Sequence, residues 1–355
     1  MKTRVIFVGG FLGAGKTSLL LKSAEMLKQQ GYRTAVITND QGHDLVDTML
    51  ARDQEEAGVA EVTGGCFCCR FYDLIDAMEK VRQAVQPDII LAEPVGSCTD
   101  LAATVLKPLE RDYPNVYDVA PFTVLVDPAR SLGGFPDSVD SLLDWQLAEA
   151  DIIAVSKADL RSEAQEVQEL ERFRSAYPNK RIVSVSAHSG AGVEEWLTEA
   201  LRPARPRNVV PVDYIVYAEA EACLGWLNAT FALTSTQLFS LKGWVADILT
   251  TLRDGLRAAD AEIAHIKLYA KSGDCSLKAG VTEFERAVDW ELADDCMVQE
   301  ASASLNARVR SEPDDLTRAV RDAVRRVGDS SGVSAEFAHL ECFSPSPPQP
   351  VFRLT

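Results

Sequence analysis

The sequence is poor in positive charge and has no long apolar run. Its 36 lysine and arginine residues face 53 aspartate and glutamate residues, which gives a formal net charge of −17. Such an acidic chain argues against a nucleic-acid partner and against binding to an anionic membrane. No stretch is apolar over the roughly 20 residues that a membrane-spanning helix needs. A strand pattern occupies the N-terminus, where a signal peptide would have to lie, so we expect a cytoplasmic protein.

Length and cysteine spacing bound the class of protein further. With 355 residues, 46% of them hydrophobic and 25% charged, the chain can form two globular domains with separate cores. Its eight cysteines would predict disulfides in a small secreted domain. Here Cys66, Cys68 and Cys69 fall within four residues of one another. In a cytosolic protein such a cluster predicts metal or redox chemistry.

A glycine-rich motif near the N-terminus organises the chain. Residues 5–8 predict a buried strand, residues 17–27 have a helical period, and residues 10–17 between them match G-x-x-x-x-G-K-[ST]. This context predicts a phosphate-binding P-loop rather than an ordinary glycine-rich turn. Lys16 would reach the β- and γ-phosphates, and the Thr17 hydroxyl would bind Mg²⁺. The nucleotide-binding residues predicted here are Gly10, Gly13, Ala14, Gly15, Lys16, Thr17 and Ser18.

Two further strand ends carry acidic residues. A strand over residues 34–40 leads into a loop with Asp40, His43 and Asp47, which fits a switch loop that meets Mg²⁺ and the γ-phosphate, although a solvated turn is the alternative. Another buried strand ends at Glu93, three residues before Gly96. We expect Glu93 to orient Mg²⁺ or the attacking water, and the Gly96 N–H to touch the γ-phosphate. The predicted catalytic residues are Lys16, Asp40 and Glu93.

The base site is predicted from two later strand ends. Asp159 follows a strand that ends in Ser-Lys-Ala-Asp, and an aspartate there can accept both the N1–H and the N2–H₂ of guanine. Lys157 would lie along the base, and the Ala187 N–H would meet the guanine O6. A role for Asp159 as a helix N-cap is the alternative. The predicted base-binding set is Ser156, Lys157, Asp159, Ser186 and Ala187.

The cysteine cluster follows two glycines that can aim its three thiols at one point. Soft thiolates suit Zn²⁺, Co²⁺ or Cu⁺, and three ligands leave a position open. His43 and Asp47 are candidates for a fourth ligand. Thiol redox switching and simple core packing are the alternatives. The other five cysteines are predicted to be isolated and structural: Cys98, Cys223, Cys275, Cys296 and Cys342.

We predict an α/β P-loop NTPase domain with a mostly parallel sheet over residues 1–203. A proline-containing linker over residues 204–212 follows it. Strand–helix–strand patterns then occur twice, which predicts an α+β, ferredoxin-like domain over residues 213–345 with a role in partner contact. Residues 346–355 form a proline-rich tail, which we interpret as an extended cover.

On these motifs the chain resembles the CobW-type members of the CobW/HypB/UreG group of P-loop GTPases. The matching segments span the first 200 residues: residues 9–18, 39–42 with Asp47, Glu61 with residues 65–69, Glu93 with Gly96, and Lys157 with Asp159. The resemblance implies slow GTP hydrolysis, a Mg²⁺ cofactor, binding of Zn²⁺ or Co²⁺ by the Cys-x-Cys-Cys motif, and a metallochaperone or insertase role.

The chain departs from that family at four places. Asp40 stands where the family usually has Glu, Pro94-Val95 where it has small or hydroxyl residues, and Ser156 where it has Asn. The histidine-rich stretch of metal-storing members is absent, and the whole chain has four histidines. These departures argue against metal storage and soften the expected selectivity for guanine.

We therefore expect a GTPase that couples its nucleotide state to metal delivery. Its expected partner is a client metalloprotein or a cofactor-assembly protein, and a homodimer is compatible with the sequence. A GTPase assembly factor that gates docking without metal transfer is the first alternative. A P-loop small-molecule kinase is the second, but such an enzyme has no use for the thiol cluster or for residues 156–159.

Overall fold

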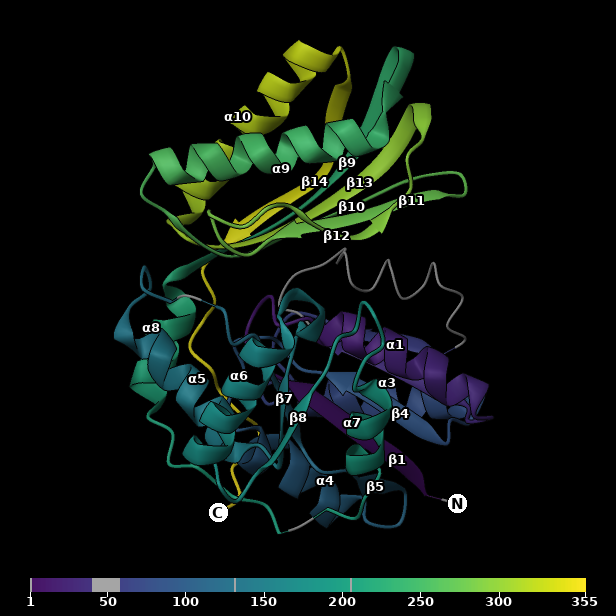
Figure 1. Ribbon diagram of the computed structural model, residues 1–355, viewed down its shortest axis with the longest axis vertical. Coiled ribbons are helices and arrows are strands. Elements are labelled where there is room, and N and C mark those ends of the chain that lie inside the picture. The colour runs from purple at the N-terminus through teal and green to yellow at the C-terminus, as the bar shows by residue number, and fades with distance from the viewer. Residues whose placement is uncertain (1, 40–57, 131, 205) are drawn as a thin grey trace.

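The computed structural model describes residues 2–39, 58–130, 132–204 and 206–355. It contains two sheets, each with its own helices, stacked one above the other (Figure 1). The predicted site residues Asp40, His43 and Asp47 lie outside the described residues.

The N-terminal sheet is parallel throughout its described strands. Its order is β3-β2-β4-β1-β6-β7-β8, and β5 pairs with β1. This confirms the predicted α/β class. The strands are β1 (Thr3–Gly9), β2 (Thr34–Asn39), β3 (Val59–Val62), β4 (Ile89–Glu93), β5 (Tyr117–Val119), β6 (Thr123–Val126), β7 (Ile152–Val155) and β8 (Arg181–Ser184).

Helices cover both faces of this sheet. They are α1 (Lys16–Gln29), α3 (Phe71–Val85), η1 (Ala102–Leu106), α4 (Lys107–Asp112), α5 (Asp137–Glu149), η2 (Ala158–Leu160), α6 (Glu163–Ala176), α7 (Val193–Ala200) and α8 (Tyr214–Ala222). The central strand β1 shows why both faces of the sheet are covered. Val5 and Phe7 enter a core with residues of α3, whereas Ile6 and Val8 enter a second core with residues of α1 and α7. A strand that is buried on both faces is apolar at every position.

The C-terminal sheet is antiparallel, in the order β12-β11-β10-β13-β9-β14. Its two helices cover the face that points away from the N-terminal sheet (Figure 1). The four strands β10-β13-β9-β14 with their two helices form the predicted ferredoxin-like arrangement. The elements are β9 (Leu224–Ser240), α9 (Leu241–Ala258), β10 (Glu262–Ser272), β11 (Cys275–Val281), β12 (Asp289–Ala293), β13 (Met297–Arg310), α10 (Pro313–Ser331) and β14 (Ser334–Phe343).

Strands β11 and β12 were not foreseen. The signal for β11 was the two-residue Gly273-Asp274 turn, which joins the Ser272–Cys275 pair of a hairpin. A disulfide links Cys275 on β11 to Cys296, just before β13. The expectation that these two cysteines are isolated was therefore wrong, because the fold brings together residues that are 21 positions apart in the sequence.

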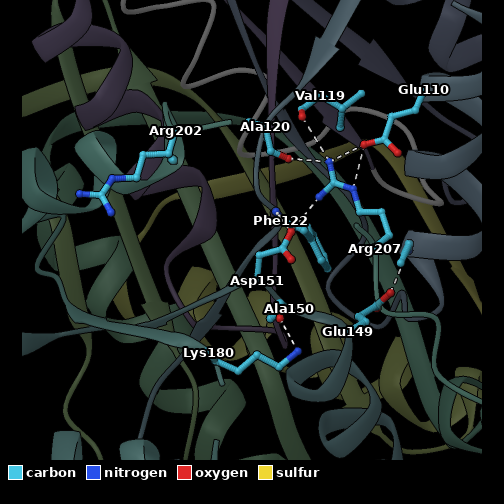
Figure 2. A network of polar contacts seen from close by, with 12 residues as sticks. Glu110, Val119, Ala120, Phe122, Glu149, Ala150, Asp151, Lys180, Arg202 and Arg207 are labelled. Atoms are coloured by element: carbon cyan, nitrogen blue, oxygen red, sulfur yellow. Dashed lines mark hydrogen bonds and ion pairs between the residues drawn. The ribbon is translucent and has the colours of Figure 1, made fainter. Parts of the chain in front are cut away.

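The predicted linker is held against the N-terminal sheet. Its Arg207 guanidinium lies 2.8 Å from carboxylate oxygens of both Glu110 and Asp151 (Figure 2). The next helix, α8, shares a core with α5, and Tyr217 is buried between them. The exact domain boundaries stay a prediction. Among the described helices, none is both long and apolar enough to cross a membrane.

Candidate functional site

The loop between β1 and α1 has a shape that glycine permits. Gly10, Gly13 and Gly15 have φ angles of 127°, 79° and 93°, which side chains rarely allow. A Cβ atom on Gly10 would lie 2.1 Å from the carbonyl oxygen of Leu125 on β6. The rest of the loop and the start of α1 line a cavity of about 780 Å³. The unpaired N–H groups at a helix start favour an anion such as phosphate.

The structure brings the predicted lysine, threonine and glutamate of the site together. The Thr17 hydroxyl donates to Glu93 Oε2 at 2.7 Å, and Lys16 Nζ lies 3.8 Å from Glu93 Oε1. Gly96 lies against them, since a Cβ atom there would be 3.0 Å from Lys16 Nζ. The adjacent hydroxyl and carboxylate oxygens are the donor type that Mg²⁺ prefers, so these residues fit that ion.

The predicted base-binding residues lie at the same cavity. Ser156, Lys157, Asp159 and Ala187 all line it, and the Ser186 hydroxyl donates to Asp159 Oδ1 at 2.5 Å. Asp159 does not cap a helix, because the N-cap of α6 is Ser162.

Two features of the backbone and side chains distinguish the predicted base site. Lys157 has a φ of 56°, an uncommon conformation for a residue with a side chain. Among the described residues, the buried Ser156 hydroxyl has no hydrogen-bond partner, although it lines the cavity. A buried polar atom without a partner costs free energy unless a ligand satisfies it.

The C-terminal sheet supplies a second wall of this cavity, which was not predicted from the sequence. Glu291 on β12 accepts a hydrogen bond from the Ser18 hydroxyl at 2.6 Å and pairs with Lys278 Nζ at 2.9 Å. The available signal was the buried polar alternation of Asn306 and Arg308 on β13. The residues of this wall include Trp226, His265, Lys267, Lys278, Asn306 and Arg308.

Charged residues connect the base site to the C-terminal sheet. Asp127, at the end of β6, pairs with Lys157 Nζ at 3.2 Å and with Arg286 at 2.8 Å. Burial acts to raise the pKa of Asp127, but the charges of Lys157 and Arg286 outweigh it and hold that pKa below its usual value. Arg130 donates to three backbone carbonyls: those of Ile263 and Ala264 on β10 and that of Thr282, just after β11.

The three motif cysteines form a compact cluster between β3 and α3. Their Sγ–Sγ distances are 2.7 Å for Cys66–Cys68, 3.3 Å for Cys66–Cys69 and 3.7 Å for Cys68–Cys69. A tetrahedral zinc with Zn–S bonds of about 2.3 Å needs separations of about 3.8 Å, so Cys66 and Cys68 would have to move apart by about 1 Å to bind it. Hydrogen bonds from Cys68 and Cys69 hold the pKa of the Cys66 thiol well below its usual value. This favours the thiolate that binds metal.

Asn39, the last residue of β2, joins the cysteine loop to the nucleotide cavity. Its side-chain NH₂ donates to the carbonyls of Val62 and Gly65 at 2.9 and 2.8 Å. Its Oδ1 accepts from the Phe67 N–H at 2.9 Å. Asn39 lines the nucleotide cavity and directly precedes the predicted switch loop. One side chain thus fixes the backbone on both sides of Cys66.

The C-terminal tail runs across the N-terminal unit (yellow in Figure 1) and contacts the cysteines. The Gln349 N–H donates to Cys69 Sγ at 3.1 Å, and the Val351 N–H donates to the Cys68 carbonyl at 2.9 Å. Arg353 pairs with the buried Asp100 at 2.7 Å. The extended cover predicted for the tail therefore lies on the cysteine cluster itself.

The central β1, the glycine loop and the Thr17–Glu93 pair together define a P-loop NTPase. The nucleotide-binding domain model of the CobW/HypB/UreG family matches residues 4–184, just over half of the chain. The chain belongs to this family, as its motifs indicated.

Two curated relatives extend this comparison. The chain is 30% identical over 193 residues to the zinc chaperone YeiR of Escherichia coli K12, across 52% of this chain and 56% of that protein. It is 31% identical over 195 residues to the zinc chaperone CobW of Pseudomonas aeruginosa, across 44% and 49% of the two chains. The chain thus spans about half the length of the curated relatives it matches.

A solved structure of Zn(II)-bound YjiA GTPase from E. coli is 17% identical, with a TM-score of 0.36. It covers 91% of this chain and 99% of that one. We therefore define the fold by the strand order described above and not by this likeness.

Proposed function

We propose that this protein is a cytoplasmic, GTP-hydrolysing metallochaperone that delivers a metal ion to a client metalloprotein or cofactor-assembly protein. The observation that carries the proposal is the Asn39 bridge, which ties the cysteine loop to the strand end that precedes the predicted switch loop. The names of the relatives favour zinc over cobalt as the cargo.

In this proposal each site residue has a definite role. Lys16 binds the β- and γ-phosphates, and Glu93 orients the attacking water or a magnesium-bound water. Thr17 and Asp40 would hold Mg²⁺, which when bound would offset the negative charge of the phosphates. Loss of the γ-phosphate removes the ligand that orders such switch segments. The Asn39 bonds would then carry their movement to the cysteines.

Base selectivity follows from Asp159, which lines the cavity. GTP should bind at least roughly tenfold more tightly than ATP, about the worth of one charged hydrogen bond. Asp159→Asn should shift the preference toward xanthine nucleotides. Xanthine has a carbonyl oxygen where guanine has an amino group, so the protein must offer a hydrogen-bond donor there in place of an acceptor. Calorimetry with GTP, ATP and XTP measures both effects. Asp247→Asn, on the exposed side of α9, is the matched control. Equal affinities for GTP and ATP in the wild type would contradict this assignment.

The central test of the proposed function is coupling between metal and nucleotide. Zn²⁺ and Co²⁺ are titrated into the protein loaded with GDP or with a non-hydrolysable GTP analogue. We expect metal affinities that differ by roughly 5–150-fold between the two forms, and an equal reciprocal effect on nucleotide affinity. The physical cause is that the two nucleotides hold the Asn39–Cys66 backbone differently.

Cysteine variants provide the controls for that titration. Cys66→Ala, Cys68→Ala and Cys69→Ala should each weaken metal binding, while Cys342→Ala on β14 should leave it unchanged. Identical metal affinities in the two nucleotide forms would eliminate the metallochaperone mechanism. A GTPase assembly factor with a structural metal would then be the better description.

A further inference from the structure

The turn after β4 holds a fourth cysteine whose backbone is fixed on two sides. The Cys98 N–H donates to the Val95 carbonyl at 2.9 Å. The buried side chain of Gln146 on α5 donates to the carbonyls of Gly96 and Cys98, at 3.0 and 2.8 Å. Both ends of the turn are thereby tied to one helix, and Cys98 is only 1% exposed.

The Cys98 side chain lies against the metal-binding motif. Its thiol interacts with the thiols of both Cys66 and Cys68. All three belong to one buried core cluster. The prediction that Cys98 is isolated was therefore wrong. About thirty positions of chain separate it from the motif, so spacing alone gave no signal.

Two of these four cysteines, Cys69 and Cys98, differ in their access to solvent. Cys69 is half-buried and accepts a hydrogen bond from the tail, whereas Cys98 is fully enclosed on the inner side. Cys66 and Cys68 contact both of them. Among the described residues, the Sγ atoms of Cys66, Cys68 and Cys69 all lie within 4.8 Å of one another, so these three could share a metal ion. A closed tetrahedral zinc site needs a fourth.

We propose that Cys98 is the fourth thiolate ligand of the metal site. Zinc would then be held by the thiolates of Cys66, Cys68, Cys69 and Cys98. Each thiol that binds loses its proton to solvent as the metal–sulfur bond forms, with no oxidation or reduction.

The position of Cys98 also gives the site a direct link to the nucleotide. Cys98 is two residues from Gly96, which lies against Lys16, and five residues from Glu93, which bonds Thr17. A change in this turn when the γ-phosphate leaves would withdraw the inner ligand. The metal would then keep three thiolates and gain an open position for a client ligand. This last step rests on the proposed function, whereas the ligand assignment does not.

The test is the number of sulfur ligands, measured by X-ray absorption on the full-length protein with one equivalent of Zn²⁺ and no nucleotide. We expect four sulfurs in the wild type. The near-isosteric Cys98→Ser should show three sulfurs and one lighter atom, and should bind Zn²⁺ at least roughly tenfold more weakly, since even outer-shell changes cost that much. Cys223→Ser, at the end of α8, is the matched control and should keep four.

A second measurement distinguishes the loss of a metal ligand from a folding defect. Charge-transfer absorption of the Co²⁺-loaded protein should fall in Cys98→Ser while its circular dichroism and melting temperature match those of Cys223→Ser. Three sulfurs in the wild type, or the same sulfur count in the wild type and Cys98→Ser, would overturn the assignment. Four sulfurs together with metal affinities that ignore the nucleotide would support Cys98 as a ligand but reject the proposed function.

Discussion

Lys16→Ala is expected to lower GTP hydrolysis at least about a hundredfold, the usual effect of removing one positioned donor to transition-state charge. Lys16 is 6% exposed and is the first residue of α1, the helix whose N-terminal end lines the cavity. Its Nζ donates to the Phe11 carbonyl at 3.3 Å, so the P-loop already holds the ammonium group inside the predicted phosphate site. Charge on the γ-phosphate oxygens must be met there during transfer.

Single-turnover hydrolysis of GTP with Mg²⁺ measures this effect. Lys16→Arg should recover part of GTP binding but little of the rate, because a planar guanidinium does not fit a site shaped for a compact ammonium. Lys80→Ala, on the exposed side of α3, is the matched control and should hydrolyse normally. A folded Lys16→Ala variant with wild-type turnover would show that the P-loop does not perform the reaction.

The nucleotide half of the site was predictable because its signals are local. The glycine positions, Lys16 and Thr17 lie within one loop, and their spacing has a single physical use. The apolar run of residues 5–8 likewise predicted a buried strand, and both faces of that strand are buried in the structure. The ferredoxin-like sheet followed from two repeats of strand, helix and strand.

The remaining features depend on contacts between distant residues. Cys98 joins Cys66 only after β4 and the cysteine loop meet at one end of the sheet. Glu291 reaches Ser18 across 273 positions of sequence. Arg207 looked like part of an ordinary linker, because its neighbours are prolines and its carboxylate partners are far away in the chain. Sequence spacing carries no information about such pairs.

Arg207→Ala is expected to lower the free energy of unfolding by about 3 kcal/mol, the lower end of the cost of breaking a buried ion pair. The Arg207 side chain is 2% exposed, whereas its partners Asp151 and Glu110 are 18% and 37% exposed. Its guanidinium also donates to the carbonyls of Val119 and Ala120, at 3.3 and 2.8 Å (Figure 2). Arg207→Ala removes the donor from these two carbonyls and leaves a cavity beside them. Because Glu110 is partly exposed, we expect the loss of unfolding free energy to be at the lower end of that range.

Urea denaturation of the full chain, followed by circular dichroism, measures this loss. Arg207→Lys should lose less than Arg207→Ala, because it keeps the charge but cannot reach two carboxylates and two carbonyls with one planar group. Arg202→Ala is the matched control, because its side chain is 56% exposed in a surface pair with Glu199 and should be worth less than about 1 kcal/mol. An equal, small loss in Arg207→Ala and Arg202→Ala would mean that residues 204–212 act as a free linker. A large loss in Arg207→Ala alone would mean that this segment is part of the N-terminal core, so that the C-terminal wall of the nucleotide cavity is held in place by a rigid connection.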